Sequence, residues 1–346
     1  MGHRLRTRTA IFVAALAGLH LTLLFAGFVA PYDPTTQSRE LPYAPPTRLH
    51  FIDGAGFHFR PFVYAWTSVL DPDQVGSYQE DRSHGYPVEF FVTGPGYPIL
   101  GRYRTTRHLF GVTEPAKVLL LGTDGYGRDE FSRLLWGGRI SVAAGITATC
   151  ITLLAGSILG LIAGYYGSWM DESLMGLTEL FLSLPWLYFL LGVRAFLPLH
   201  LDPLDTFFLL TGVIGLIGWA RPARLVRGIV LSARNRNYVF AARGFGGSDV
   251  YLLRRHILPE TFGVLLTQAA LLVPRYIAAE ATLSFFGLGV SEPVPSWGNM
   301  LSILQQYSVL VSYGWLLAPA CALVVTSVLY SSLADVLHSR LESHST

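Results

Sequence analysis

Long apolar runs are the feature that most limits what this chain can fold into. A helix that crosses a lipid bilayer needs about 20 consecutive, mostly apolar residues. Six segments qualify, and only 14% of all residues are charged, against about 25% in soluble domains. The runs cover residues 10–30, 140–166, 174–199, 207–226, 261–288 and 315–333. The sequence therefore predicts an all-α polytopic membrane protein with six transmembrane helices.

The first run admits two interpretations. It follows Arg4, Arg6 and Arg8, as the apolar region of a signal peptide does. Such a region has about 7–15 residues and ends at an Ala-x-Ala-like cleavage site. This run is longer, and Phe28-Val29-Ala30 matches a cleavage site poorly. We therefore favour an uncleaved transmembrane helix.

The distribution of arginine predicts the orientation. Short loops rich in Lys and Arg stay in the cytoplasm. Between residues 221 and 255 there are eight Arg and a single acidic residue, Asp249, whereas the loops 198–206 and 289–314 contain neither Lys nor Arg. Only the loop 167–173 disagrees with this rule, because the orientation places it in the cytoplasm although it is acidic. We expect a multi-pass protein of the inner or plasma membrane, surrounded by lipid, with both termini in the cytoplasm.

This orientation places residues 31–139 outside the cytoplasm. Between residues 51 and 110 the segment has 13 aromatic residues, interrupted repeatedly by Gly and Pro. That pattern is typical of short strands and turns, and predicts a small packed external module. We expect residues 45–117 to contact another protein on that side, the alternative being a passive insertion. The predicted divisions are residues 1–30 (tail and first helix), 31–139 (external segment) and 140–340 (membrane core).

Enzyme and metal motifs are absent from the sequence. Lys117 is the only lysine and lies in Pro-Ala-Lys-Val, so the Gly-Lys-Ser/Thr of a P-loop cannot form. There is no His-Glu-x-x-His, no Gly-x-Ser-x-Gly and no metal-ligand spacing among the ten His. Cys150 and Cys321 lie in apolar runs. We predict no catalytic residue, no metal and no cofactor, and the formal charge of +2 gives no reason to expect nucleic acid.

The basic segment 232–260 carries the most local information. Its pattern predicts a helix over 238–245 that stops at Gly246-Gly247, then a second helix capped by Ser248 or Asp249 that ends before Pro259. Two short helices around a glycine turn would make a rigid knob for a protein partner. The alternative is a basic amphipathic loop that lies on anionic lipid.

This segment resembles the EAA loop of permease subunits in binding-protein-dependent ABC importers. That pattern is Glu-Ala-Ala, three residues, Gly, nine residues, Ile, one residue and Leu-Pro. Phe240 stands at the position of the Glu and His256 at that of the Ile. The resemblance implies that the ATPase subunits dock here, on Phe240, Ala241, Ala242, Gly246, Gly247, Leu258 and Pro259.

Two further stretches resemble dipeptide and oligopeptide permeases. They are Leu121-Gly-Thr-Asp-Gly-Tyr-Gly-Arg-Asp-Glu-Phe-Ser-Arg133, and Glu280-Ala-Thr-Leu-Ser-Phe-Phe-Gly-Leu-Gly289 followed by Pro295-Ser-Trp-Gly298. The resemblance implies a five-helix permease core after an N-terminal helix. It implies a second homologous permease, two ATPase subunits that bind the ATP, and an extracytoplasmic substrate-binding protein. The binding protein or the partner permease is then the expected contact of residues 45–117. Peptides are the implied substrate, with nickel and oligosaccharides left open.

Charged and small residues within the runs suggest further roles. Arg275 and Glu280, five residues apart and so about 140° around a helix, either hold helices together or line and gate the pathway. A secondary transporter, the alternative function, would need carboxylates at mid-membrane, and Glu280 is the one candidate.

Two further features concern the shape and packing of the helices. Pro185 predicts a kink in the third run. Small residues every fourth position predict close helix packing at Ala144, Ala148, Thr152, Gly156, Gly160 and Gly164.

Overall fold

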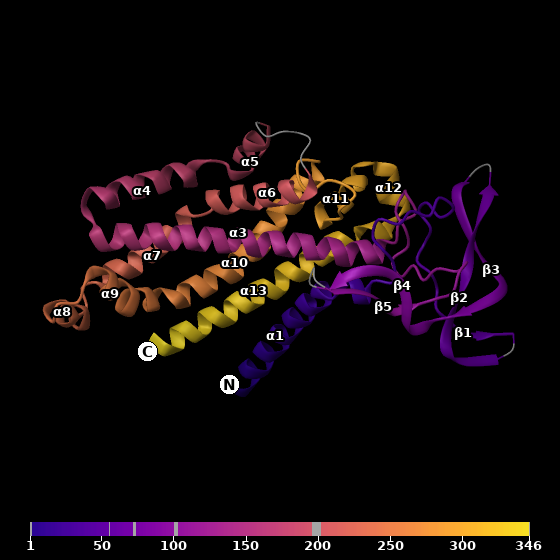
Figure 1. Cartoon of the computed structure of the whole chain (residues 1–346), viewed down its shortest axis with the longest axis horizontal. Coiled ribbons are helices and arrows are strands. Elements are labelled where there is room, and N and C mark those ends of the chain that lie inside the picture. The colour runs from indigo at the N-terminus through magenta and orange to yellow at the C-terminus, as the bar shows by residue number, and fades with distance from the viewer. Residues whose placement is uncertain (1, 55, 72–73, 100–102, 196–201, 346) are drawn as a thin grey trace. The chain divides into compact units, whose positions relative to one another are not determined.

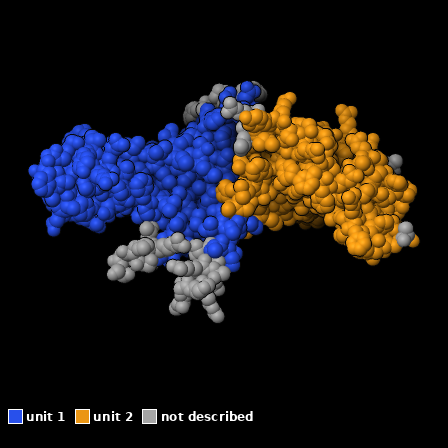
Figure 2. Space-filling model, turned by 60° about the horizontal axis from the view of Figure 1, so that its bottom comes forward, with its two compact units in different colours: residues 1–16, 142–283, 325–346 blue, residues 17–141, 284–324 orange. Residues whose placement is uncertain are grey.

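The computed structural model describes all residues except 1, 55, 72–73, 100–102, 196–201 and 346. The chain forms two compact units that interleave along the sequence (Figure 2). The first unit contains residues 1–16, 142–283 and 325–346, and the second contains residues 17–141 and 284–324.

Helices dominate the described chain, as the apolar runs predict (Figure 1). Three are long and apolar enough to cross a membrane: Glu130–Tyr166, Asp249–Phe285 and Gly314–Ser339. The helices are α1 (Gly2–Leu24), α2 (Ala26–Val29), α3 (Glu130–Tyr166), α4 (Ser168–Ser183), α5 (Trp186–Ala195), α6 (Pro203–Ile217), α7 (Ala220–Ala233), α8 (Asn237–Gly244), α9 (Asp249–Leu252), α10 (Leu258–Phe285), α11 (Trp297–Ser302), α12 (Tyr307–Ser312) and α13 (Ala318–Ser345).

The fourth run is bent. Its helices α6 and α7 meet at an angle of 44° and count as one span only if they are taken together. The first run gives a shorter apolar helix, Ala10–Leu24. The described residues thus contain three clear spans, or four with the bent pair.

The third run is broken where a kinked helix was expected. Helix α4 ends at Ser183, Leu184 is extended with φ −71° and ψ 131°, and α5 begins at Trp186. Proline has no N–H for the helical ladder, and its ring disfavours helical backbone at the preceding residue. Pro185 therefore separates two helices instead of bending one. The end of this predicted run, residues 196–199, and most of the following loop lie outside the described residues.

Close packing between α3 and α7 follows the small residues of α3. A Cβ added to Gly156 would lie 2.7 Å from Pro222 Cβ, and one on Gly164 would lie 2.7 Å from Val230 Cβ. The hydroxyl of Thr152, on the same face, donates to the carbonyl of Gly215 at 2.7 Å. The prediction of tight helix packing is confirmed, since only small residues let two helix backbones approach so closely.

The second unit contains five strands, so the all-α description applies to the predicted membrane helices and not to this part. The strands are β1 (His50–Asp53), β2 (Gly56–Asp71), β3 (Gln74–Pro87), β4 (Glu89–Ile99) and β5 (Tyr103–Gly111). Strands were expected from the aromatic, Gly- and Pro-punctuated pattern here, but β2 and β3, of 16 and 14 residues, are longer than the short strands predicted. The reason is that β2 and β3 pair with each other in antiparallel fashion along their length, from the pair of Phe62 with Pro87 to the pair of Asp71 with Gln74. Bulges absorb the shifts in register.

The sheets are antiparallel and share a small core. One sheet has three strands in the order β1-β2-β3, and a second sheet consists of β4 and β5. One hydrophobic cluster joins Val63 of β2, Val88, Ala116 and Val118. His108 of β5 is buried, with its ring nitrogens 2.6 Å and 2.9 Å from the carbonyl oxygens of Ala30 and Pro95. These contacts make the strands part of a packed unit.

Candidate functional site

The turn after α8 has the backbone geometry that its glycines predict. Gly246 has φ +85°, in the left-handed region that side chains with a Cβ disfavour. The N–H of Gly247 donates to the carbonyl of Ala242 at 3.0 Å, and a Cβ on Gly247 would lie 2.8 Å from that oxygen. The predicted glycine turn is therefore confirmed at both positions.

The second helix of this segment does not end before Pro259, contrary to the prediction. Ser248 caps α9, accepting from the N–H of Tyr251 at 3.4 Å. A π turn, Leu253–Ile257, then leads directly into α10, which holds Pro259 at its second position. A π turn widens the helix locally, so the ring of Pro259 need not collide with the preceding turn. The knob is consequently continuous with a long apolar helix.

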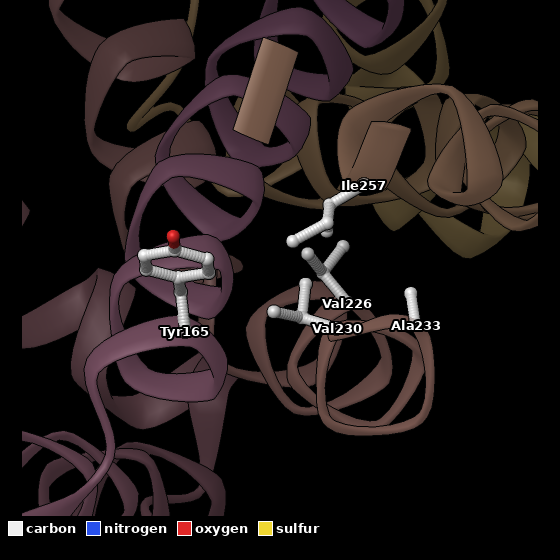
Figure 3. Close-up of a cluster of buried hydrophobic side chains, with 5 residues drawn as sticks. All are labelled: Tyr165, Val226, Val230, Ala233 and Ile257. Carbon is white, nitrogen blue, oxygen red and sulfur yellow. The ribbon is translucent and has the colours of Figure 1, made fainter. Parts of the chain in front are cut away.

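The base of the knob rests on buried apolar side chains. The cluster comprises Tyr165 of α3, Val226, Val230 and Ala233 of α7, and Ile257 of the π turn. Figure 3 shows Ile257 directed toward Val226, and Val226 and Val230 on the same side of one helix. Val239 of α8 is also buried. This packing fixes the two short helices, which are too short to be stable by themselves.

A polar contact joins the same elements, and sequence analysis missed it. The Tyr165 hydroxyl donates to Asp249 Oδ1 at 2.5 Å and accepts from Arg243 Nη2 at 2.8 Å. Arg234 donates to the carbonyls of Gly164 and Tyr165 at the end of α3. The one local signal was the end of the helix at Tyr165-Tyr166-Gly167. The groups that bond to it lie 69 to 84 residues further along the chain.

The outer face of the knob exposes apolar side chains. Phe245 is 93% exposed, and Arg236 beside this face pairs with Glu260 at 3.2 Å. We call the exposed set the knob surface: Tyr238, Phe240, Phe245, Val250 and Tyr251. Of the predicted docking residues, Ala241, Gly246 and Pro259 are exposed, while Ala242, Gly247 and Leu258 are half-buried. Large apolar side chains exposed together mark an interaction surface.

The two predicted pathway residues are not brought together. Glu280 is buried at 1% exposure, whereas Arg275 is exposed and lines a cavity of about 230 Å³. Within the described residues they form no ion pair with each other. Five residues apart on α10, the two side chains point in different directions, as the helical geometry requires.

A charged cluster in the second unit unites the two other family-like stretches. Arg128 donates to Asp124 at 2.7 Å and to Glu292 at 2.6 Å, and Arg133 donates to Glu292 at 2.8 Å. Burial alone would raise the pKa of the Glu292 carboxyl, but the adjacent Arg133 and Arg128 hold it below its ordinary value. Glu292 was missed because it lies between the stretches 280–289 and 295–298. Among the residues described, no group of three or more His, Cys, Asp or Glu is placed to hold a metal ion.

Comparison with known proteins decides the family. The profile of the family described as "Binding-protein-dependent transport system inner membrane component" matches residues 156–343, more than half of the chain. The chain belongs to this family. The matched residues include the knob, α10 and most of α13.

Individual relatives of this permease carry consistent names. It is 36% identical to the oligopeptide transport system permease protein OppC of Bacillus subtilis over 71% of this chain and 79% of that protein. It is 37% identical to the dipeptide transport system permease protein DppC of the same species, over 64% and 67% respectively. It is 33% identical to the glutathione transport system permease protein GsiD of Pectobacterium atrosepticum, over 66% and 73%. These relatives are transport permeases, which supports an importer permease over a secondary transporter.

Proposed function

We propose that this permease forms half of the translocation pathway of an ABC importer for peptides. Its similarity to proteins named as oligopeptide, dipeptide and glutathione permeases supports that substrate class. Its own chain has no catalytic role, and ATP is bound by partner subunits. A second homologous permease, two ATPase subunits and an extracytoplasmic substrate-binding protein complete the complex.

The topology that suits this role has six spans with both termini in the cytoplasm. The spans are α1 with α2, α3, α4 with α5, α6 with α7, α10 and α13. Three of these are long and apolar enough individually, the α6–α7 pair qualifies together, and the break at Pro185 divides another. Residues 31–139 then form the external segment, residues 140–340 the core and residues 232–260 the cytoplasmic coupling loop.

The knob surface is the observation that carries the proposed coupling role. Its exposed aromatic residues stand on a base that is held by the Tyr165 cluster and by the Tyr165–Asp249 hydrogen bond. A surface that is apolar outside and rigid below suits a groove on another protein. Because the π turn leads into α10 without a break, a displacement of the knob by the ATPase is passed directly to α10. Alternating access follows from that movement.

Two substitutions test the coupling role. Gly246→Val forces a left-handed backbone on a β-branched residue, at a cost of roughly 1–2 kcal/mol, and misaligns α9. Ala242→Asp places an unpaired charge at the docking contact, where its desolvation is costly. The matched control is Gly244→Ala, because Gly244 has ordinary backbone angles and nothing within 4 Å of an added Cβ.

The measurement compares the complete complex of each variant in liposomes for ATPase recruitment, ATP turnover and peptide uptake. We expect Gly246→Val and Ala242→Asp to insert into the membrane but to lose recruitment or substrate-stimulated turnover, while Gly244→Ala behaves as wild type. If both variants keep all three activities, the knob is not the coupling site and the lipid-surface alternative is favoured.

A further inference from the structure

A cavity in the first unit lies where several helices are interrupted. Its volume is about 230 Å³. Leu184 and Trp186 flank it at the α4–α5 break, and Gly218 flanks it at the α6–α7 bend. Tyr276, two residues after Pro274 of α10, closes another side. In membrane transporters, discontinuous helices commonly mark the place where a substrate binds.

The cavity contains two positive charges and no negative one. Arg221, in the first turn of α7, and Arg275 of α10 both line it, and the rest of its lining has no Asp or Glu. Within the described part of the chain, no carboxylate lies within ion-pair distance of either guanidinium. The other arginines of α7 differ: Arg224 pairs with Glu179 and Arg227 with Asp171, both on α4.

Arg221 and Arg275 are both exposed at this cavity, and cations within membrane-spanning segments are seldom retained without a role. An anionic group between Arg221 and Arg275 would bind both through charge-assisted hydrogen bonds, which Arg makes in a bidentate manner with carboxylates. Trp186, Phe181 and most other lining residues are apolar, and the lining holds no carboxylate that would compete with the anion.

We propose that this cavity binds the carboxylate end of the transported peptide during its passage. The inference rests on the proposed function and adds the chemical group that the pathway recognises. A volume of about 230 Å³ holds a terminal residue with its carboxylate but not a whole peptide, since ligand pockets usually measure about 300–1,000 Å³. The remainder of the peptide would extend beyond the cavity.

The test uses the complete complex in liposomes and two probes: a pool of tripeptides with free carboxyl ends and the same pool with amidated ends. The variants are Arg221→Gln, Arg275→Gln and the charge-preserving Arg275→Lys. Arg224→Gln is the matched control, since it removes an α7 charge that already has a partner. Each variant's uptake is divided by the wild-type value for the same pool, so that the preference of the binding protein cancels.

We expect both Gln variants to lose uptake of the free pool by about tenfold more than uptake of the amidated pool, because a hydrogen bond to a charged group is lost. Arg275→Lys should recover part of the difference, and Arg224→Gln should affect both pools equally. Equal losses for both pools in the Gln variants would overturn the proposal and assign the arginines to lipid phosphate or to folding. If the wild-type complex takes up neither pool, the peptide substrate itself is wrong and the inference fails with it.

Discussion

Gly160 of α3 shows how a single residue decides helix packing in this permease. A Cβ at this position would lie 2.5 Å from the carbonyl oxygen of Ala223 and 2.8 Å from Val226 Cβ. Neither a backbone carbonyl nor a buried Val can move without displacing α7. We therefore predict that Gly160→Ala lowers the stability of the complex by about 1–3 kcal/mol. Thermal unfolding of the purified complex in detergent measures this change.

The control for that prediction is Gly228→Ala. Gly228 is in α7, is exposed and has nothing within 4 Å of an added Cβ. Alanine is the better helix former by about 1 kcal/mol, so this variant should keep or raise the unfolding temperature. Equal unfolding temperatures for both variants would show that close contact between α3 and α7 does not limit stability.

Glu292 gives a residue-scale prediction for pH. Its pKa is lowered in the folded protein, so its contribution to stability is complete above the ordinary value of 4.5 and is lost as the pH falls through the folded value. Because the Glu292 side chain is 46% exposed, Glu292→Gln should cost about 1–2 kcal/mol at neutral pH, less than a fully buried pair. Unfolding of both proteins between pH 7 and pH 3 checks this. A difference that does not shrink below pH 4.5 would contradict it.

At the scale of elements, Tyr165 links the end of α3 to the knob. Tyr165→Phe keeps the ring in the hydrophobic cluster but removes the hydrogen bonds to Asp249 and Arg243. Since both partners are more than half exposed, the loss of folding stability should be small. We expect ATPase recruitment to persist while peptide uptake per ATP hydrolysed falls several-fold. Tyr166→Phe, at the adjacent exposed position, is the control and should keep the wild-type ratio.

For the whole molecule, we predict that the strand-rich segment takes part in the delivery of substrate. Phe57 and Phe59 of β2 form an edge-to-face pair, 5.4 Å between ring centroids, and are 63% and 94% exposed. Buried aromatic residues dominate many protein interfaces. We predict that replacing both with Thr lowers binding-protein-stimulated ATP turnover by about tenfold without reducing membrane insertion. The control is Tyr103→Thr, which changes an exposed aromatic residue of β5. Unchanged stimulation would instead favour a passive insertion.

Local signals in the sequence determined several features by themselves. Apolar run length predicted the membrane helices, and three of them are confirmed as long, apolar helices. Gly246 predicted a left-handed turn because few other residues adopt that backbone. The four-residue spacing of Gly156, Gly160 and Gly164 predicted helix contact because it places small residues on one face. Each of these depends on neighbouring residues within one or a few turns.

Tertiary structure alone decided the rest, because the groups involved are remote in the chain. Arg128 meets Glu292 across 164 positions, and Tyr165 meets Asp249 across 84. The continuity past Pro259 depended on a π turn whose Ile257 packs against α3 and α7, which no propensity of the segment indicates. Arg221 and Arg275 share a cavity because the α4–α5 break and the α6–α7 bend line the same cavity as α10. Periodicity reports which face of a helix is apolar, but the partner of each face is chosen by the packing of the whole chain.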